Sequence, residues 1–247
     1  MYNPRARAGE SGDSTTAPAP ITRQLVKFDF FKVDRTWRDL PDFDRSQARK
    51  EFAGVVDRFS DDLLIRSYSL VGIRGDVDFM LWTVAEDLRQ LHDFGSALRK
   101  TRLGRFLDIP HAYLAGTKRS MYISKHKHPG QEGDRSRIVP GTAPYLFVYP
   151  FVKNRPWYGL SKATRQGMMD AHIALGHKYP SVKINTTYSY GIDDQEFVVA
   201  FEADSPHEFL DLVMELRETD ASLYTERDTP SFSCLALPLH EVLDALG

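Results

Sequence analysis

The stretch Arg155-Pro-Trp157-Tyr-Gly-Leu160 repeats the pattern of Arg35-Thr-Trp37-Arg-Asp-Leu40, which lies 120 residues earlier in the chain. Each copy follows an apolar segment with the character of a strand, and each precedes a segment with helical spacing. The repeat continues to Glu196-Phe197, which corresponds to Asp78-Phe79 at nearly the same offset. The chain is therefore a duplicated unit, and its two halves should share one fold.

Hydrophobic periodicity predicts the same order of elements in both halves, namely strand, helix, two strands, helix and closing strand. In the first half the expected segments are 24–33, 45–59, 63–71, 76–84, 88–102 and 120–124. In the second half they are 144–152, 161–178, 182–190, 195–202, 206–218 and 231–237. The order βαββαβ is the ferredoxin-like pattern. We expect an α+β fold in which two duplicated ferredoxin-like halves form a dimeric α+β barrel-like arrangement.

Bulk composition indicates a globular protein of the ordinary kind. The 247 residues have 42% hydrophobic content and a net charge of −2, so no overall field favours nucleic acid or an anionic membrane. The single cysteine, Cys234, excludes an internal disulfide and indicates a reducing compartment. Residues 1–20 lack the apolar core of a signal peptide and predict a disordered tail, so we expect a cytoplasmic protein.

The two halves are expected to span residues 21–125 and 144–247, joined by a basic loop, 126–143. Prolines and glycines interrupt this loop, which indicates irregular structure. A long irregular connection is either a solvated loop or a functional segment. His126 and His128 could hold a metal there, although the sequence supplies no third ligand and loop histidines are commonly only solvated.

His172 is the first candidate for chemistry. It shares a helical stripe with Met168, Leu175 and Tyr179, so its side chain should face apolar surroundings. An inward histidine is more often a hydrogen-bonded core residue than a ligand. The alternative is an axial ligand to haem iron, which requires a neutral imidazole in an apolar pocket. The matching helix of the first half has no histidine, which favours the functional interpretation.

Tyr149 and Lys153 are the second pair of candidates. In a regular strand they share one face with Tyr145, Phe147 and Phe151, although Pro150 permits a bulge. An aromatic face that ends in a lysine is suited to a flat, anionic ligand. The alternative is ordinary sheet packing in which Lys153 extends outward to solvent.

These residues together resemble the chlorite dismutase superfamily. The resemblance is carried by Tyr149-Pro-Phe-Val-Lys153, Trp157-Tyr158, Asp170-Ala-His172 and Gly191-Ile-Asp-Asp194, and it extends over residues 24–238. It implies two ferredoxin-like halves, one haem-type group in the C-terminal half with His172 as the axial ligand of its iron, and a homopentamer. The branches of this family include chlorite dismutases and the peroxide-dependent decarboxylases that complete haem synthesis.

Three positions in the resemblance favour the decarboxylase branch. Chlorite dismutases have a distal arginine where this chain has Ile184, and an aliphatic side chain cannot bind an oxyanion. Tyr149 and Lys153 fall on the tyrosine and lysine of the decarboxylases. Chlorite dismutases bond the proximal histidine to a glutamate where this chain has Ala221, next to Asp220.

The resemblance thus implies oxidative decarboxylation of two propionates of iron coproporphyrin III (coprohaem) by hydrogen peroxide, with haem b as product. Tyr149 and Lys153 would be catalytic, His172 would be the iron ligand, and Arg137, Trp157 and Ser231 would also contact the porphyrin. Neither His126 nor His128 matches a distal base. Chlorite dismutation, a porphyrin carrier without turnover, and an interaction domain that binds no porphyrin remain open as alternatives.

Overall fold

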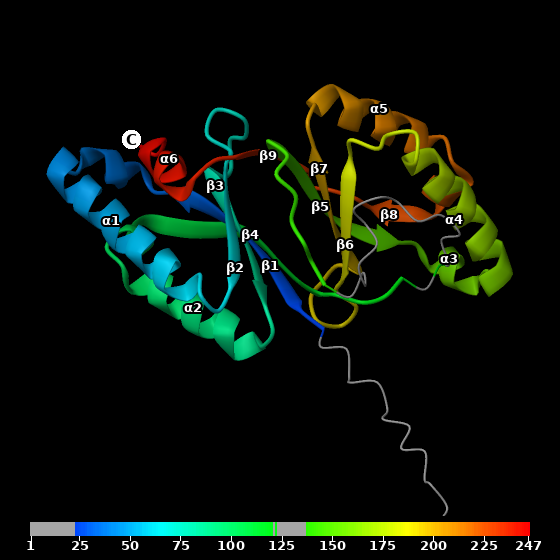
Figure 1. The fold of residues 1–247 in the computed structure, drawn as a ribbon, viewed down its shortest axis with the longest axis horizontal. Coiled ribbons are helices and arrows are strands. Elements are labelled where there is room, and N and C mark those ends of the chain that lie inside the picture. The colour runs from blue at the N-terminus through cyan, green and yellow to red at the C-terminus, as the bar shows by residue number, and fades with distance from the viewer. Residues whose placement is uncertain (1–22, 121, 123–136) are drawn as a thin grey trace, which may run out of the picture.

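The structure is a computed structural model that describes residues 23–120, 122 and 137–247. The expected tail, residues 1–20, and the loop histidines His126 and His128 lie outside the described residues. In Figure 1 the strands occupy the middle of the molecule, with α1, α2 and α6 on one side and α3, α4 and α5 on the other. None of the described helices is both long and apolar enough to cross a bilayer.

Each half has the expected order of strand, helix, two strands, helix and closing strand, together with short additional helices, and the second half also has one extra short strand. The first half comprises β1 (Leu25–Val33), η1 (Arg35–Asp39), α1 (Asp42–Phe59), β2 (Leu64–Ser69), β3 (Phe79–Ala85), α2 (Leu88–Lys100), η2 (Leu103–Phe106) and β4 (Leu107–Gly116). The second half comprises β5 (Tyr145–Lys153), α3 (Arg155–Gly159), α4 (Lys162–Gly176), β6 (Lys183–Tyr188), β7 (Phe197–Ala203), α5 (Pro206–Arg217), η3 (Asp220–Tyr224), β8 (Thr225–Arg227), β9 (Phe232–Ala236) and α6 (Leu239–Asp244).

The strands form a closed ring. Within the first half the order is β4-β1-β3-β2, and within the second it is β9-β5-β7-β6, with antiparallel neighbours throughout. This is the same ferredoxin-like order twice. The half-sheets join edge to edge where Tyr68 of β2 pairs with Ala236 of β9 and where Gly116 of β4 pairs with Tyr188 of β6. The expected barrel-like arrangement is confirmed, and closure leaves neither half-sheet with an open edge.

The closing strand of the first half was predicted wrongly. It is Leu107–Gly116, whereas residues 120–124 were expected, of which 121, 123 and 124 lie outside the described residues. Pro110 disguises this strand because proline cannot donate to a ladder. The pairing of β1 with β4 is irregular at this point, since the register shifts between Phe30 and Lys32 opposite the proline. A bulge accommodates the missing N–H group, and the strand continues past it.

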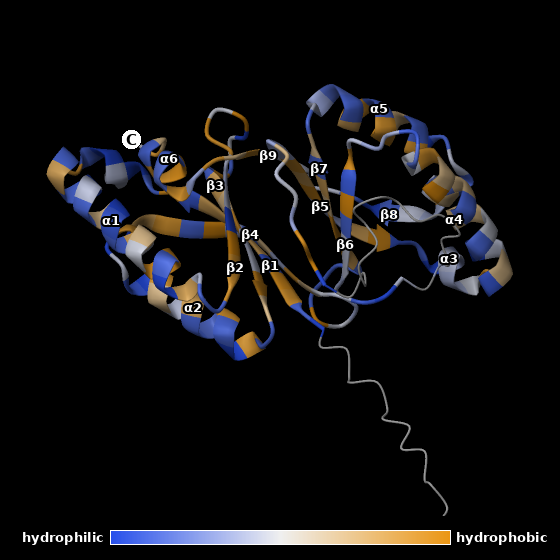
Figure 2. Ribbon diagram, in the orientation of Figure 1, coloured by the Kyte–Doolittle hydropathy of each residue, from blue (hydrophilic) through white to orange (hydrophobic). Residues whose placement is uncertain are grey.

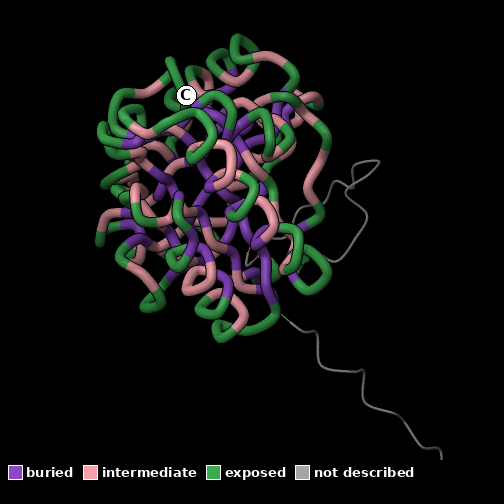
Figure 3. Tube along the Cα trace, turned by 90° about the vertical axis from the view of Figure 1, so that its left-hand side faces the viewer, coloured by how far each residue is buried: buried purple, intermediate pink, exposed green. Residues whose placement is uncertain are grey.

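Apolar side chains fill three layers. The barrel interior combines both halves, with residues such as Phe28, Trp82, Val148 and Val198. A second layer lies between the first half-sheet and α1, α2 and α6, and a third lies between the second half-sheet and α4 and α5. Apolar colour therefore concentrates on the strands in Figure 2, and the buried trace in Figure 3 runs through the centre of the molecule.

The repeated residues occupy equivalent places. The Asp78 carboxylate accepts the Val33 N–H at 2.8 Å, and the Glu196 carboxylate accepts the Lys153 N–H at 2.8 Å. Gly72 and Gly191 both have positive φ, at 75° and 72°, in the turns before these acids. The two halves can therefore be compared position by position at the repeat offset.

Candidate functional site

The outward face of β5 is aromatic, as the alternation predicts. Tyr145, Phe147, Tyr149 and Phe151 face the helices of the second half, while Leu146 and Val148 enter the barrel interior. Tyr149 stacks on Phe201 with ring centroids 5.7 Å apart. Burial, with a smaller contribution from the charge of Asp228, raises the pKa of the Tyr149 phenol above its ordinary value.

Lys153 ends this aromatic strand and is only 8% exposed. Its Nζ donates to the Ala221 carbonyl at 2.6 Å and lies over the Trp157 ring, 4.7 Å from the centroid, and over the Phe151 ring at 5.1 Å. Burial lowers the pKa of this amine to about 8. The amine is therefore held in an aromatic pocket next to η3 instead of extending into solvent.

His172 lies on α4, which begins at Lys162 because the Ser161 hydroxyl accepts the Thr164 N–H. Its Nδ1 is buried and has no hydrogen-bond partner among the described residues. Burial, followed by the charge of Lys153, lowers the pKa of the imidazole to about 4. The imidazole is therefore neutral at physiological pH, which is the form that binds a metal. These properties fit an axial ligand to porphyrin-bound iron.

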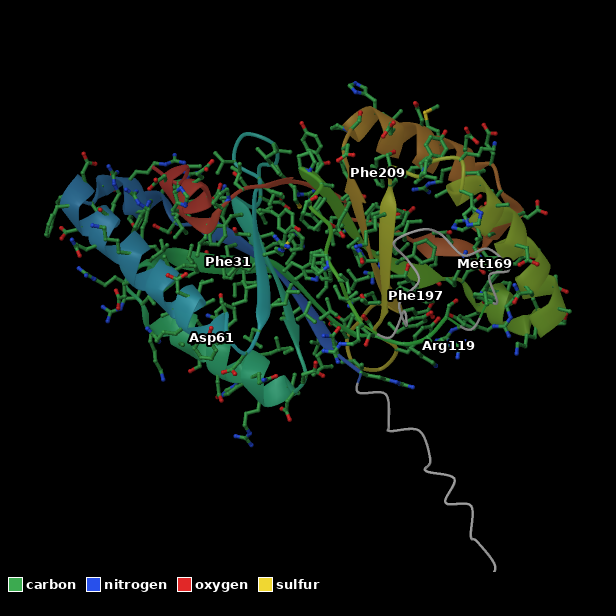
Figure 4. All side chains as sticks on the ribbon, viewed as in Figure 1. Phe31, Asp61, Arg119, Met169, Phe197 and Phe209 are labelled. Atoms are coloured by element: carbon green, nitrogen blue, oxygen red, sulfur yellow. The ribbon has the colours of Figure 1, made fainter. Side chains whose placement is uncertain are left out.

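The first half has an apolar core residue at the position that corresponds to His172. At the repeat offset His172 corresponds to Phe52 of α1, which is buried against Phe31 and Phe79 with ring centroids 6.5 and 6.1 Å away. Helix α1 buries four residues, whereas none of the residues of α4 is fully buried. Figure 4 shows α4, with Met169, and α5, with Phe209, beside the strands of this half. The second half has thus exchanged a core contact for an imidazole that has no hydrogen-bond partner among the described residues.

Trp157 is buried against Tyr224 with centroids 5.5 Å apart. Its counterpart Trp37 is also buried, and the Trp37 indole Nε1 donates to the Gly247 carbonyl at 3.0 Å. Burial of this tryptophan is therefore part of the shared fold. The Lys153 amine over its ring is specific to the second half, because the first half has Val33 at that position.

Ile184 and Ala221 are the two positions at which the family resemblance distinguishes this chain from chlorite dismutases. Ile184 of β6 pairs with Phe201 and lies on the outward face, and a Cβ added to Gly176 of α4 would meet its Cδ1 at 4.0 Å. Ala221 is buried, and its carbonyl oxygen is occupied by Lys153. Asp220 is exposed. Among the described residues, no carboxylate hydrogen-bonds the His172 Nδ1.

Arg137 and Ser231 are placed differently from the other candidates. The Arg137 Nη2 donates to Glu86 Oε1 at 2.5 Å, so its guanidinium contacts the first half and is not brought to the group around His172. Ser231 is exposed, and its carbonyl accepts Arg74 Nη1 at 2.6 Å. It follows Asp228 closely in the chain, and the charge of Asp228 acts on Tyr149.

Sequence reasoning missed two polar groups at this face. Arg217 forms an ion pair with Asp228, and both charges act on the Tyr149 phenol. The Tyr158 hydroxyl donates to Glu196 Oε2 at 2.5 Å and is 2.9 Å from the Tyr190 hydroxyl. The repeat contained a signal for Arg217, because Leu216-Arg217 matches Leu98-Arg99 and the Arg99 charge acts on Asp29, the counterpart of Tyr149.

The lowered pKa of His172 predicts a pH-dependent stability. In the unfolded chain this histidine binds a proton near the ordinary imidazole pKa of 6.5, whereas in the folded protein it does so only near 4. Between these values the unfolded state binds more protons, so the stabilisation present above pH 6.5 is lost as the pH falls toward 4. In paired urea titrations, the stability of His172→Phe relative to wild type should rise by roughly 2 kcal/mol as the pH is lowered through this window. A constant difference would show that the imidazole titrates normally.

Comparisons with known proteins show which family the chain resembles. The family model described as chlorite dismutase matches residues 45–237. A coproheme decarboxylase of Mycolicibacterium smegmatis is 33% identical over 77% of this chain and 81% of its own, and that of Staphylococcus carnosus is 31% identical over 76% and 81%. A solved chlorite dismutase mutant of Candidatus Nitrospira defluvii superposes with a TM-score of 0.82 at 28% identity, over 90% of this chain and 94% of that one.

Proposed function

Because the chain belongs to the chlorite dismutase family, we propose that it decarboxylates iron coproporphyrin III with hydrogen peroxide and forms haem b. A neutral imidazole without a partner, next to an aromatic sheet face that carries Tyr149 and Lys153, is the feature that best supports this function. The similarity to two coproheme decarboxylases supports it as well.

The reaction balances with one peroxide for each propionate. A propionate, hydrogen peroxide and a proton give a vinyl group, carbon dioxide and two waters. The substrate supplies its own redox centre, because its iron is the place where peroxide is reduced. The protein must therefore hold the macrocycle and place one propionate at a time beside an oxidisable side chain. It must also allow the proton that each decarboxylation consumes to reach the site.

Three side chains have distinct roles in this proposal. His172 donates its lone pair to the iron and needs no proton loss to do so, because its imidazole is already neutral. Tyr149 gives up the hydrogen of its phenol and then takes one from the propionate carbon. Lys153 provides a cation within reach of a carboxylate, and such positioning contributes up to ~7–11 kcal/mol in ideal cases.

Ile184 argues against chlorite dismutation. Its side chain on the outward face is aliphatic and 43% exposed, so it offers no donor to an oxyanion. Among the described residues no carboxylate hydrogen-bonds the His172 Nδ1, and this leaves the imidazole a weaker electron donor than a carboxylate-bonded one. Both features favour the decarboxylase over the dismutase.

A peroxide titration tests the function directly. The purified protein, loaded with iron coproporphyrin III, should lose two carboxyl groups in successive steps as peroxide is added, with completion near two equivalents per porphyrin by mass spectrometry. Oxygen release from chlorite should stay at the level of free haem. A porphyrin that keeps its mass under peroxide would identify a carrier, and vigorous oxygen release would identify a dismutase.

The homopentamer and the cytoplasmic location expected from the family resemblance are part of the same proposal. Light scattering coupled to size-exclusion chromatography measures the assembly, with and without coprohaem.

A further inference from the structure

Arg165 is a cation that the second half leaves without a partner. It lies on α4, half-buried, and its Nε is fully buried with no hydrogen-bond partner in the described part of the chain. Within residues 23–120, 122 and 137–247, its guanidinium forms no ion pair. A buried Nε–H without an acceptor is costly, because its desolvation is not offset by a hydrogen bond.

The first half supplies an internal comparison. At the repeat offset Arg165 corresponds to Arg45 of α1, whose Nε is buried in the same way. The Arg45 Nη1 donates to the Arg38 carbonyl at 3.1 Å, and its Nη2 forms an ion pair with Asp42. The position of Asp42 is taken by Lys162 in the second half. The duplication has thus kept the arginine and replaced its carboxylate with a second cation.

Arg165 also lies on the same face of α4 as His172. Seven residues separate them, which is close to two helical turns, so both side chains leave the same face of α4. Their separation along the helix axis is about 10 Å. This is comparable to the distance from the centre of a porphyrin to its peripheral carboxylates. Both residues present a buried nitrogen without a partner, on a helix that buries none of its residues fully.

We propose that Arg165 binds a carboxylate at the edge of the porphyrin whose iron His172 ligates. The inference rests on the proposed function and assigns a specificity residue to the same site. A carboxylate of the substrate then pairs with Arg165 as Asp42 pairs with Arg45 in the first half. A guanidinium and a carboxylate form a bidentate, charge-assisted pair. Arg165 thereby favours porphyrins with a carboxylate at this corner over those without one.

Optical titration with two porphyrins tests this assignment. Arg165→Gln should weaken binding of iron coproporphyrin III by roughly 10- to 100-fold, whereas Arg165→Lys should weaken it less, because lysine keeps the charge without the planar fork. Binding of the tetramethyl ester of the same iron porphyrin should be equal in wild type and Arg165→Gln. The affinity difference for the acid should also shrink as salt is added.

The matched control is Arg45→Gln, which removes the equivalent guanidinium from the first half. It should lower the melting temperature and leave coprohaem affinity unchanged. Equal coprohaem affinity in Arg165→Gln and wild type would overturn the assignment, as would an equal loss for acid and ester, which marks a purely structural role. A wild-type protein that binds neither porphyrin would instead refute the proposed function.

Discussion

His172→Phe is expected to abolish ligation of porphyrin iron and, at the same time, to raise the melting temperature of the ligand-free protein. The substitution removes the donor, so affinity for coprohaem should fall by at least about 100-fold, given that loss of a ligand's mere supporting contact already costs 10- to 100-fold. It also removes a buried Nδ1 that has no hydrogen-bond partner among the residues the structure describes. Leaving such a group unsatisfied costs about 1–3 kcal/mol.

The first half shows that phenylalanine suits this position of the fold. Phe52 occupies it there, fully buried between Phe31 and Phe79. We therefore expect the free energy of unfolding of His172→Phe to rise by about 1 kcal/mol, because α4 gains an apolar contact and loses a desolvated polar atom. Differential scanning calorimetry on the ligand-free protein measures this change, and the absorption spectrum with coprohaem measures ligation.

The reverse substitution, Phe52→His, is the control. It places a polar ring in a filled core, so it should destabilise the protein by about 3 kcal/mol without creating a second porphyrin site. A histidine-ligated spectrum in His172→Phe would show that another residue holds the iron. Destabilisation of His172→Phe similar to that of Phe52→His would show that the imidazole is a core residue after all.

The internal repeat made the fold predictable from the sequence. The prediction failed only where a strand is locally irregular. Regular alternation and helical spacing place eleven of the twelve expected elements within a few residues. The exception is β4, where Pro110 and a register shift conceal the strand. Ring closure depends on very few pairs between the halves, such as Gly116 with Tyr188. A single long-range pair leaves no periodic signal in the sequence.

The candidate site was likewise predictable where it depends on periodicity. The orientation of His172 and the shared face of the β5 aromatics follow from periodicity, so both were predictable. The hydrogen-bond partner of Lys153 was not predictable, because it is the backbone carbonyl of Ala221. Every residue has a backbone carbonyl, so the sequence carries no signal for this contact. The contact of Arg137 with Glu86 is equally hidden, since it pairs a loop residue with a distant half. Contacts between residues that are far apart in the chain can be identified only from the structure.

Tyr149→Phe is expected to bind coprohaem normally and to convert almost none of it. The change removes one oxygen and keeps the ring that stacks on Phe201, so affinity and stability should stay close to wild type. The rate of propionate loss should fall by roughly 100-fold or more, which is typical when a positioned proton-transfer group is removed. Rapid-quench mass spectrometry after one addition of peroxide measures this rate.

Burial raises the pKa of the Tyr149 phenol, so the phenol stays protonated over a wider pH range than that of an exposed tyrosine. Burial keeps the phenol protonated, so its oxidation must move a proton together with an electron. The product of that step can recover the hydrogen from a propionate carbon, which starts the loss of carbon dioxide. Replacing Tyr149 with 3,5-difluorotyrosine, whose phenol is more acidic, should therefore change the pH profile of the rate and leave coprohaem affinity unchanged.

Tyr145→Phe is the matched control, since Tyr145 is on the same face of β5 but four residues earlier, roughly 13 Å along the strand. It loses the same atom at a place too far from Tyr149 to serve the same propionate. Both variants share the aromatic face and the barrel behind it, so a general weakening of the sheet should affect them alike. Wild-type turnover in Tyr149→Phe, or an equal loss in Tyr145→Phe, would remove the Tyr149 hydroxyl from the reaction.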